Sequence, residues 1–164
     1  ALGENDYKAY MQKLADEEKA RQALEARTVD KVSPGEQQPE TDHRMETDNS
    51  DKGNTEGIFF RDAQDGHYFS YLMQTKGETN LSLQLKFWGQ DEWRTSEFDI
   101  YVNDKLLCSV NNSHRWRTTQ FKTVDYEIPA EFVKGKKEVR VKFVAHKGKQ
   151  VGQIYGVRLV KNLK

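Results

Sequence analysis

The sequence predicts a mainly β protein, an antiparallel β-sandwich preceded by one helix and an extended connector. Three observations support this fold class. Eight short segments between Ile58 and Val160 alternate apolar and polar residues, as strands with one buried and one solvated face do. Uneven polar loops separate these segments. All three tryptophans and all eight phenylalanines lie after residue 57, where a core can form.

Charge divides the 164 residues into two unlike parts. Residues 1–56 carry 14 acidic and 8 basic side chains, a net of −6, whereas residues 57–164 carry 12 acidic and 18 basic side chains, a net of +6. The acidic part has no Phe, Trp or Ile and can bury little surface. We therefore expect a helix over residues 1–28, a connector over residues 29–56 and the sandwich domain over residues 57–164.

The helix is predicted from Asp6 to about Thr28, with Asn5 or Asp6 as its N-cap, because strong helix formers dominate this stretch. Its first two turns carry an apolar stripe at helical spacing, formed by Tyr7, Tyr10, Met11 and Leu14. Glu17 and Arg21 stand where a coiled coil needs apolar residues, so a stable coiled coil is not expected. The stripe instead predicts a helix that packs on another surface.

The connector shows no period and contains Ser33-Pro34-Gly35, which is typical of irregular chain. Part of it, near His43–Thr47, is expected to pair at an edge of the sandwich. Farther on, Pro129 ends a strand and Ala130–Val133 is predicted to form one helical turn. The uneven loops favour a jelly roll or a related sandwich over a closed, ligand-holding barrel.

If the strands run up and down, four loops meet at one end of the sandwich, namely Arg61–Gly66, Gly89–Ser96, Asn111–Thr118 and His146–Gln150. We call the polar and aromatic side chains expected there the loop rim: Asp91, Trp93, Arg94, His114, Trp116 and Arg117. Indole faces stack on sugar rings, and the other groups can bind hydroxyls. The alternative is that both tryptophans cap the core. Trp88, at the end of a strand, is expected to pack.

Catalytic and metal chemistry are not predicted. No spacing marks a pair of catalytic carboxylates among the rim acids, and the four histidines lack the spacing of zinc ligands. A structural calcium ion in loop Asp48–Asn54 or Asp62–Asp65 stays open. The single cysteine, Cys108, fits a small core residue and cannot form an intramolecular disulfide.

Nucleic-acid and membrane partners are not expected either. The basic residues that follow Val133 fit the solvated face of a strand and its neighbouring turns, although a polyanion-binding surface remains an alternative. No stretch is apolar enough to cross a membrane, and the first residues, Ala1–Glu4, show no signal peptide.

Several segments resemble the C-terminal region of bacterial β-L-arabinofuranosidase-like glycoside hydrolases. They are Arg27–Asp30, Pro34–Glu40, Asp42-His43, Arg61–Ala63, Phe69–Tyr71, Phe98–Ile100, Tyr126–Pro129 and Ile154–Leu159. The resemblance implies a galactose-binding-like jelly roll, with residues 1–28 a remnant of the junction with a catalytic barrel. It also implies a secreted or periplasmic enzyme. That barrel and its zinc-bound cysteines have no counterpart in this sequence, so no catalytic residue carries over.

The sequence therefore predicts a non-catalytic accessory domain of a bacterial glycoside hydrolase that binds a plant-type oligosaccharide or polysaccharide weakly at the loop rim. No cofactor is expected. The alternative is a structural domain that buttresses the catalytic domain of the parent enzyme, or a subunit interface, through the stripe on the helix. Exposure of the rim tryptophans would favour glycan binding, and their burial would favour the buttress.

Overall fold

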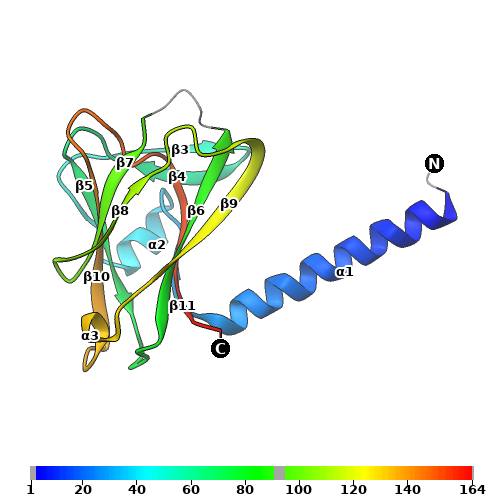
Figure 1. The fold of residues 1–164 in the computed structure, drawn as a ribbon, viewed down its shortest axis with the longest axis horizontal. Helices are drawn as coiled ribbons and strands as arrows, with labels where there is room; N and C mark the ends of the chain where they lie inside the picture. The colour runs from blue at the N-terminus through cyan, green and yellow to red at the C-terminus, as the bar shows by residue number, and fades with distance from the viewer. Residues whose placement is uncertain (1–2, 91–94, 164) are drawn as a thin grey trace.

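The computed structural model describes residues 3–90 and 95–163, in which eleven strands form two antiparallel sheets packed as a sandwich (Figure 1). The six-stranded sheet has the order β3-β4-β11-β6-β9, and β1 also pairs with β11. Its members are β1 (Thr28–Val32), β3 (Asp51–Thr55), β4 (Ile58–Asp62), β6 (Leu81–Gln90), β9 (Arg117–Glu127) and β11 (Ile154–Lys161). The mainly β sandwich that the alternation predicts is confirmed.

The five-stranded sheet has the order β2-β5-β10-β7-β8. Its members are β2 (Glu46–Thr47), β5 (Tyr68–Gln74), β7 (Glu97–Val102), β8 (Lys105–Asn111) and β10 (Glu138–Ala145). Asn103 and Asp104 both have positive φ and form a tight turn between β7 and β8. Helix α3 (Ala130–Val133) is the helical turn predicted after Pro129.

The core lies between the sheets and follows the alternation of the sequence. In β6, Leu81, Leu83, Leu85 and Phe87 point inward and are at most 4% exposed. In β10, Val139, Val141 and Phe143 are completely buried opposite them. Because successive side chains of a strand point to opposite faces, Gln84, Lys86 and Trp88 of β6 are placed on the outer face of the six-stranded sheet.

Helix α1 (Glu4–Arg27) projects away from the sandwich, and none of its residues is buried (Figure 1). It begins earlier than predicted, and Gly3 rather than Asn5 or Asp6 is the N-cap. Glu4 and Asp6 instead lie in the first turn, where acidic groups interact favourably with the helix dipole. The predicted stripe is exposed, with Tyr7 at 56% and Tyr10 at 50%.

Residues 29–56 contain more regular structure than an extended connector. They form most of β1, helix α2 (Gln37–Asp42), β2 and β3. Strand β1 pairs with β11, and β3 pairs with β4. The predicted edge pairing is confirmed, because Glu46 and Thr47 pair with Ser70 and Phe69 of β5. Short, polar strands of this kind lack the alternation that reveals the others, so their sequence resembles that of irregular chain.

Polar side chains also attach this segment to the sandwich. The Glu40 carboxylate on α2 accepts hydrogen bonds from Arg61 Nε at 2.6 Å, Arg61 Nη2 at 2.8 Å and Tyr71 Oη at 2.6 Å. The Asp30 carboxylate on β1 contacts His43 Nε2 at 3.0 Å and accepts from the backbone N–H of Gln74 at 2.8 Å. Both carboxylates therefore join the N-terminal segment to β4 or β5.

Candidate functional site

The predicted meeting of four loops at one end of the sandwich is confirmed. The backbone N–H of Val151 donates to the Ala63 carbonyl at 2.9 Å, and that of Gln150 donates to the Thr95 carbonyl at 3.0 Å. The Asn112 N–H donates to the Ser96 carbonyl at 2.9 Å, which attaches the loop after β8 to the same group. Residues distant in sequence are thus brought together at this end.

The loop rim is only partly described by the structure. Asp91, Trp93 and Arg94 lie outside the described residues. His114 and Arg117 are exposed. Trp116 is half-buried, with its ring 5.8 Å from the Phe87 ring and 4.6 Å from the Arg115 guanidinium. Trp116 therefore packs against the core, as the alternative interpretation expects, and glycan binding at the rim stays a prediction.

Below the rim, Asn112 offers an unused hydrogen-bond donor. Its side chain is 8% exposed, and its Oδ1 accepts from Arg115 Nη1 at 2.9 Å. Among the described residues, no acceptor reaches its Nδ2. Asn112 lines a cavity of about 10 Å³ beside Trp88, Trp116 and Gln153, which is space for roughly one water molecule.

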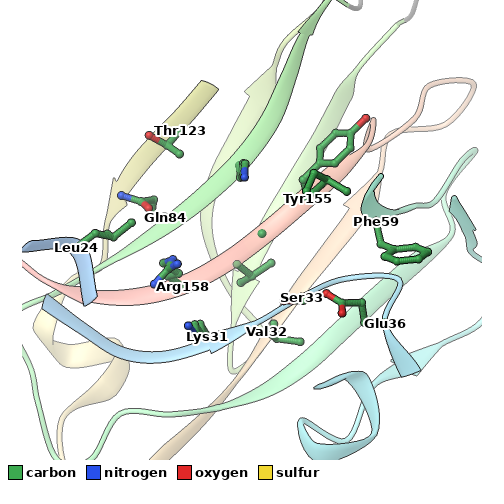
Figure 2. Close-up of a pocket in the computed structure, with 14 residues that line it drawn as sticks. Leu24, Lys31, Val32, Ser33, Glu36, Phe59, Gln84, Thr123, Tyr155 and Arg158 are labelled. Carbon is green, nitrogen blue, oxygen red and sulfur yellow. The ribbon is translucent and has the colours of Figure 1, made fainter. Parts of the chain in front are cut away.

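A larger depression lies on the outer face of the six-stranded sheet. We call it the outer groove; its volume is about 330 Å³. Its lining comes from α1, β1 and the loop after it, and β4, β6, β9 and β11: Leu24, Lys31, Val32, Ser33, Glu36, Ile58, Phe59, Gln84, Lys86, Thr123, Tyr155, Gly156, Val157 and Arg158. Figure 2 shows Leu24 at one end of this groove and Phe59 and Tyr155 toward the other.

Strand register explains why polar groups form the floor. Gln84 pairs with Arg158 on β11 and with Asp125 on β9. Lys86 pairs with Gly156 on β11 and with Thr123 on β9. Because these residues alternate with buried apolar ones, their side chains share the outer face. The walls are more apolar, since Ile58 and Phe59 of β4 are 40% and 44% exposed.

A row of aromatic rings borders the floor. Ring centroids are 5.4 Å apart for Phe60 and Tyr155, 5.0 Å for Tyr155 and Phe121, and 4.8 Å for Phe121 and Trp88. Trp88 therefore packs, as predicted, but on the outer face of the sheet. The Tyr155 hydroxyl is bonded to Thr55 Oγ1 at 2.7 Å and donates to Gln153 Oε1 at 2.8 Å, so this ring is held firmly.

The cationic side chains of the outer groove do not all have a carboxylate partner among the described residues. Arg158 Nη1 donates to Glu25 Oε1 and to Thr28 Oγ1, both at 3.0 Å. Lys31 Nζ contacts the same Glu25 carboxylate at 3.3 Å. Lys86 Nζ lies 4.4 Å from the centre of the Phe121 ring. Burial, and then the positive charge of Arg158, lower the pKa of the Lys86 ammonium.

Sequence reasoning missed the outer groove. The local sequence feature that points to it is the alternation in β6, where the outward residues Gln84 and Lys86 alternate with buried leucines. The remaining lining residues come from strands and loops far apart in the sequence, and their proximity depends on strand order. Periodicity predicts which face a residue occupies, but it does not predict which strands are neighbours.

The polar side chains that do meet on the five-stranded sheet do not form a nucleophilic site. Ser109 Oγ donates to Asp99 Oδ1 at 2.5 Å, and His146 Nε2 lies 2.7 Å from the same oxygen. The serine thus bonds to the carboxylate and not to the imidazole that would have to remove its proton. Cys108 is half-buried against the core, and burial raises the pKa of its thiol, which opposes thiolate chemistry.

The acidic loops considered for calcium are bonded to neighbouring loops. Asp48 Oδ1 accepts from the Tyr68 N–H, Asp62 Oδ1 from the Gly152 N–H, and Asp65 Oδ1 from the Gly148 N–H. Within residues 3–90 and 95–163, no three His, Cys, Asp or Glu side chains are grouped in a way that could hold a metal ion. None of the helices in the same ranges combines the length and hydropathy needed to cross a membrane.

Solved structures with a similar fold include carbohydrate-binding modules and enzymes. A family 35 carbohydrate-binding module from an environmental isolate has 20% identity and a TM-score of 0.54, covering 71% of this chain and 82% of its own. The family 35 module from Clostridium thermocellum has 9% identity and a TM-score of 0.57, covering 80% of this chain and 98% of its own. These similarities confirm the jelly-roll sandwich.

A third similar structure is a longer enzyme, the GH26-CBM35 β-(1,4)-mannanase from Podospora anserina. It has 8% identity and a TM-score of 0.55, and the match covers 82% of this chain but 28% of the mannanase. A search of curated proteins finds no match to this chain. The family model that matches is DUF6805, described as a family of unknown function, over residues 23–160. The chain therefore belongs to the DUF6805 family of unknown function.

Proposed function

We propose that this protein is a non-catalytic carbohydrate-binding accessory domain, and that its glycan lies in the outer groove. The observation that carries this proposal is the composition of the groove, in which a polar floor meets apolar walls. Sugars are amphipathic in the same sense, since their hydroxyls bond to side chains while their C–H faces pack on rings. Gln84 and Thr123 can bond to hydroxyls, and the exposed ring of Phe59 can pack on a sugar face.

The size of the groove agrees with this proposal. Its volume of about 330 Å³ is at the lower end of the range for small-ligand sites and suits one or two sugar rings. The structural neighbours point in the same direction, because they include carbohydrate-binding modules. The mannanase shows such a fold within a longer enzyme.

The sequence resemblance suggests the kind of enzyme to which this domain is attached. We propose that the domain is attached to the catalytic domain of a secreted or periplasmic bacterial enzyme of the β-L-arabinofuranosidase-like kind, which degrades plant-type polysaccharide. An accessory domain that binds the polymer raises the effective concentration of substrate near a linked catalytic site. Weak binding at one site is sufficient for this effect. A structural calcium ion in an acidic loop also stays a prediction.

The loop rim is the alternative site for the same function. Trp93, Trp116, Arg94, Arg117, His114 and Asp91 were predicted to form it. Asn112 adds support, because a ligand hydroxyl could accept a hydrogen bond from its unused Nδ2. Against the rim stands the packing of Trp116 on Phe87, which reduces the indole surface available for stacking.

The two sites can be distinguished by one titration. Amide NMR shifts of the full chain are followed while arabinose- and galactose-containing oligosaccharides are added to millimolar concentration. Saturable shifts in β6, β9 and β11 at the groove support the outer groove, whereas shifts confined to residues 89–96 and 111–118 place the ligand at the rim. Absence of saturable shifts at either place contradicts carbohydrate binding by these sugars.

A matched pair of variants tests the groove directly. Phe59→Ala removes an exposed ring from the groove wall and is expected to weaken binding about tenfold, the loss that one stacking contact of about 1 kcal/mol or somewhat more produces. Leu106→Ala is the control, because Leu106 is similarly exposed at 51% but lies on β8 of the other sheet. Equal affinities in the two variants would count against the groove.

A structural role remains the second candidate function, and the exposed stripe of α1 favours it. Met11 and Leu14 are 45% and 40% exposed beside Tyr7 and Tyr10, and no residue of this helix is buried. Such a stripe is typical of a helix that packs on a neighbour. This function predicts a folded domain with no sugar-dependent shifts.

A further inference from the structure

Lys86 has no carboxylate partner within the described residues, although it lies on the floor of the outer groove. Its ammonium lies over the Phe121 ring at 4.4 Å. Three carboxylates line or adjoin the groove. One of them, Asp125, accepts a hydrogen bond from Gln84 at 2.9 Å and forms an ion pair with Arg27 at 3.4 Å. Glu25 is engaged by Arg158 and Lys31, and Glu36 lies beside Ser33 at the edge of the groove in Figure 2. With Arg27 included, four cations thus face three carboxylates among the described residues, and none of the ion pairs includes Lys86.

The register of the sheet brings Lys86 close to Arg158. Arg158 pairs with Gln84, and Lys86 pairs with Gly156, so the two cations are diagonal neighbours on one face. Diagonal neighbours of adjacent strands are about 7–8 Å apart, near enough for one anionic group to contact both side chains. The effect of Arg158 on the pKa of Lys86 reflects the same proximity.

Gly156 keeps the space beside Lys86 open. A Cβ atom at Gly156 would lie 3.3 Å from Lys86 Cβ and 3.8 Å from its Cδ, so any larger residue would cover the flank of the lysine. Because residue 156 has no side chain, a ligand can approach Lys86 from the side of β11. Arg158 also has a further guanidinium nitrogen beyond the Nη1 that Glu25 and Thr28 occupy.

We infer that the outer groove selects an acidic glycan, and that the carboxylate of a uronic acid binds between Lys86 and Arg158. The inference rests on the proposed function and names the class of sugar. An anion there would supply the negative charge that Lys86 lacks and would contact the free part of the Arg158 guanidinium. Charge-assisted hydrogen bonds of this kind are stronger than those between neutral groups.

The test compares two ligands that differ only in charge. Isothermal titration of the full chain uses an oligogalacturonate and the same oligosaccharide after reduction of its carboxyl groups to alcohols. We expect the acidic form to bind at least about tenfold more tightly at low salt. Added salt should reduce that preference, because the groove is partly open to solvent.

Lys86→Met is the diagnostic variant, since it removes the charge and retains an apolar stem over Phe121. Lys142→Met is the matched control, because Lys142 on β10 lies 4.2 Å from the Tyr68 ring in the other sheet. The preference for the acidic ligand should disappear in Lys86→Met and persist in Lys142→Met. Thermal unfolding of both variants verifies that they are folded.

Each other outcome has a definite meaning. Equal affinity of the native chain for the two ligands overturns the acidic preference and leaves carbohydrate binding intact. No binding of either ligand, or of the neutral arabinose- and galactose-containing sugars, contradicts the proposed function itself. If acetate alone produces the same NMR shifts with the same affinity as the oligogalacturonate, the site is a simple anion site, and the inference of a glycan fails.

Discussion

Glu40 is a buried carboxylate that three hydrogen bonds attach to Arg61 and Tyr71. Burial alone would raise the pKa of Glu40, but the hydrogen bonds from Arg61 and Tyr71 outweigh it, so the pKa is lowered. Tyr71 shows the converse effect. Burial, and then the charge of Glu40, raise the pKa of its phenol well above the usual value. The carboxylate therefore stays charged and the phenol stays a donor at neutral pH.

Replacing Glu40 or Tyr71 should lower the free energy of unfolding, and the two losses should differ in size. Glu40→Gln leaves the Arg61 charge buried without a counter-charge, so we expect a loss of about 3–5 kcal/mol in the free energy of unfolding. Tyr71→Phe removes one hydrogen bond to a charged group and should cost about 1.5–3 kcal/mol. Urea unfolding measures both. Glu131→Gln, at an exposed site on α3, is the control, and a loss in Glu40→Gln no larger than in the control would refute the role of the ion pair.

The pair of Asp30 and His43 predicts a pH dependence of stability. The hydrogen bond to Asp30 raises the pKa of His43 above 6.5, against the effect of burial, and Asp42 contributes in the same direction. A raised pKa means that the folded state holds the proton more tightly. The contribution of protonated His43 to the free energy of unfolding is complete below the unfolded-state pKa of about 6.5. This contribution is lost as pH rises through the pKa of His43 in the folded state.

The measurement is the free energy of unfolding as a function of pH for the native chain and for His43→Gln. The difference between the two should shrink as pH rises above about 6.5. Asp30 has a lowered pKa, because hydrogen bonds from His43 and the Gln74 amide outweigh burial, so its own contribution is lost only in acid. His114→Gln, at an exposed position, is the control. A difference that does not vary with pH would contradict the assignment.

At the scale of elements, α1 and the sandwich meet only at the end of the helix. Glu25 bonds to Arg158, Arg27 Nε donates to the Lys161 carbonyl at 3.0 Å, and Thr28 Oγ1 donates to the Leu24 carbonyl at 2.7 Å. The helix before Leu24 is exposed throughout, and the match to the family model begins at residue 23. The first turns of α1 thus lie outside the part of the chain that the family model matches.

Deleting residues 1–22 should therefore leave the sandwich as stable as before. We expect a change of less than about 0.5 kcal/mol in the free energy of unfolding, because exposed surface contributes little. Circular dichroism at 222 nm should lose most of its helical signal in the same variant. The outcome that would contradict this expectation is a loss above about 2 kcal/mol, which would mean that the stripe of Tyr7, Tyr10, Met11 and Leu14 stabilises the isolated domain.

The elements also show what sequence analysis can reach. Most strands after residue 57 follow from alternation, since one face of each packs on the core; β4 is an exception, because its Ile58 and Phe59 are exposed and its Arg61 and Asp62 are buried. Strand β3, with the sequence Asp51–Thr55, has no apolar face and is held by its pairing with β4, so its own residues do not reveal it. The same limit applies to the outer groove. Alternation places Lys86 on the polar face of its strand, but its proximity to Arg158 and Gly156 depends on β11 lying beside β6.

For the whole molecule, the central feature is that the first strand of the chain pairs with the last one. Strand β11, the last, pairs with β1 over Val157–Val160 and with β6 along its other edge. Strand β1 is the first strand of the chain, so the start and the end of the sandwich stabilise each other. Charge and composition predict a domain boundary at residue 56. The pairing of β1 with β11 instead extends the folded domain to residue 28.

Hydrogen exchange distinguishes a single cooperative unit from a domain with a loosely attached connector. If β1 is part of the unit, its amides should exchange with the same free energy of opening as those of β11, close to the free energy of global unfolding. Amides of α1 before Leu24 should exchange faster by local fraying, because the residues of this part of the helix are exposed. Mass spectrometry of peptides covering residues 5–22, 28–32 and 154–161 gives the three rates. Exchange in β1 as fast as in α1 would show that residues 29–56 act as a connector after all, and would place the folded domain after residue 56.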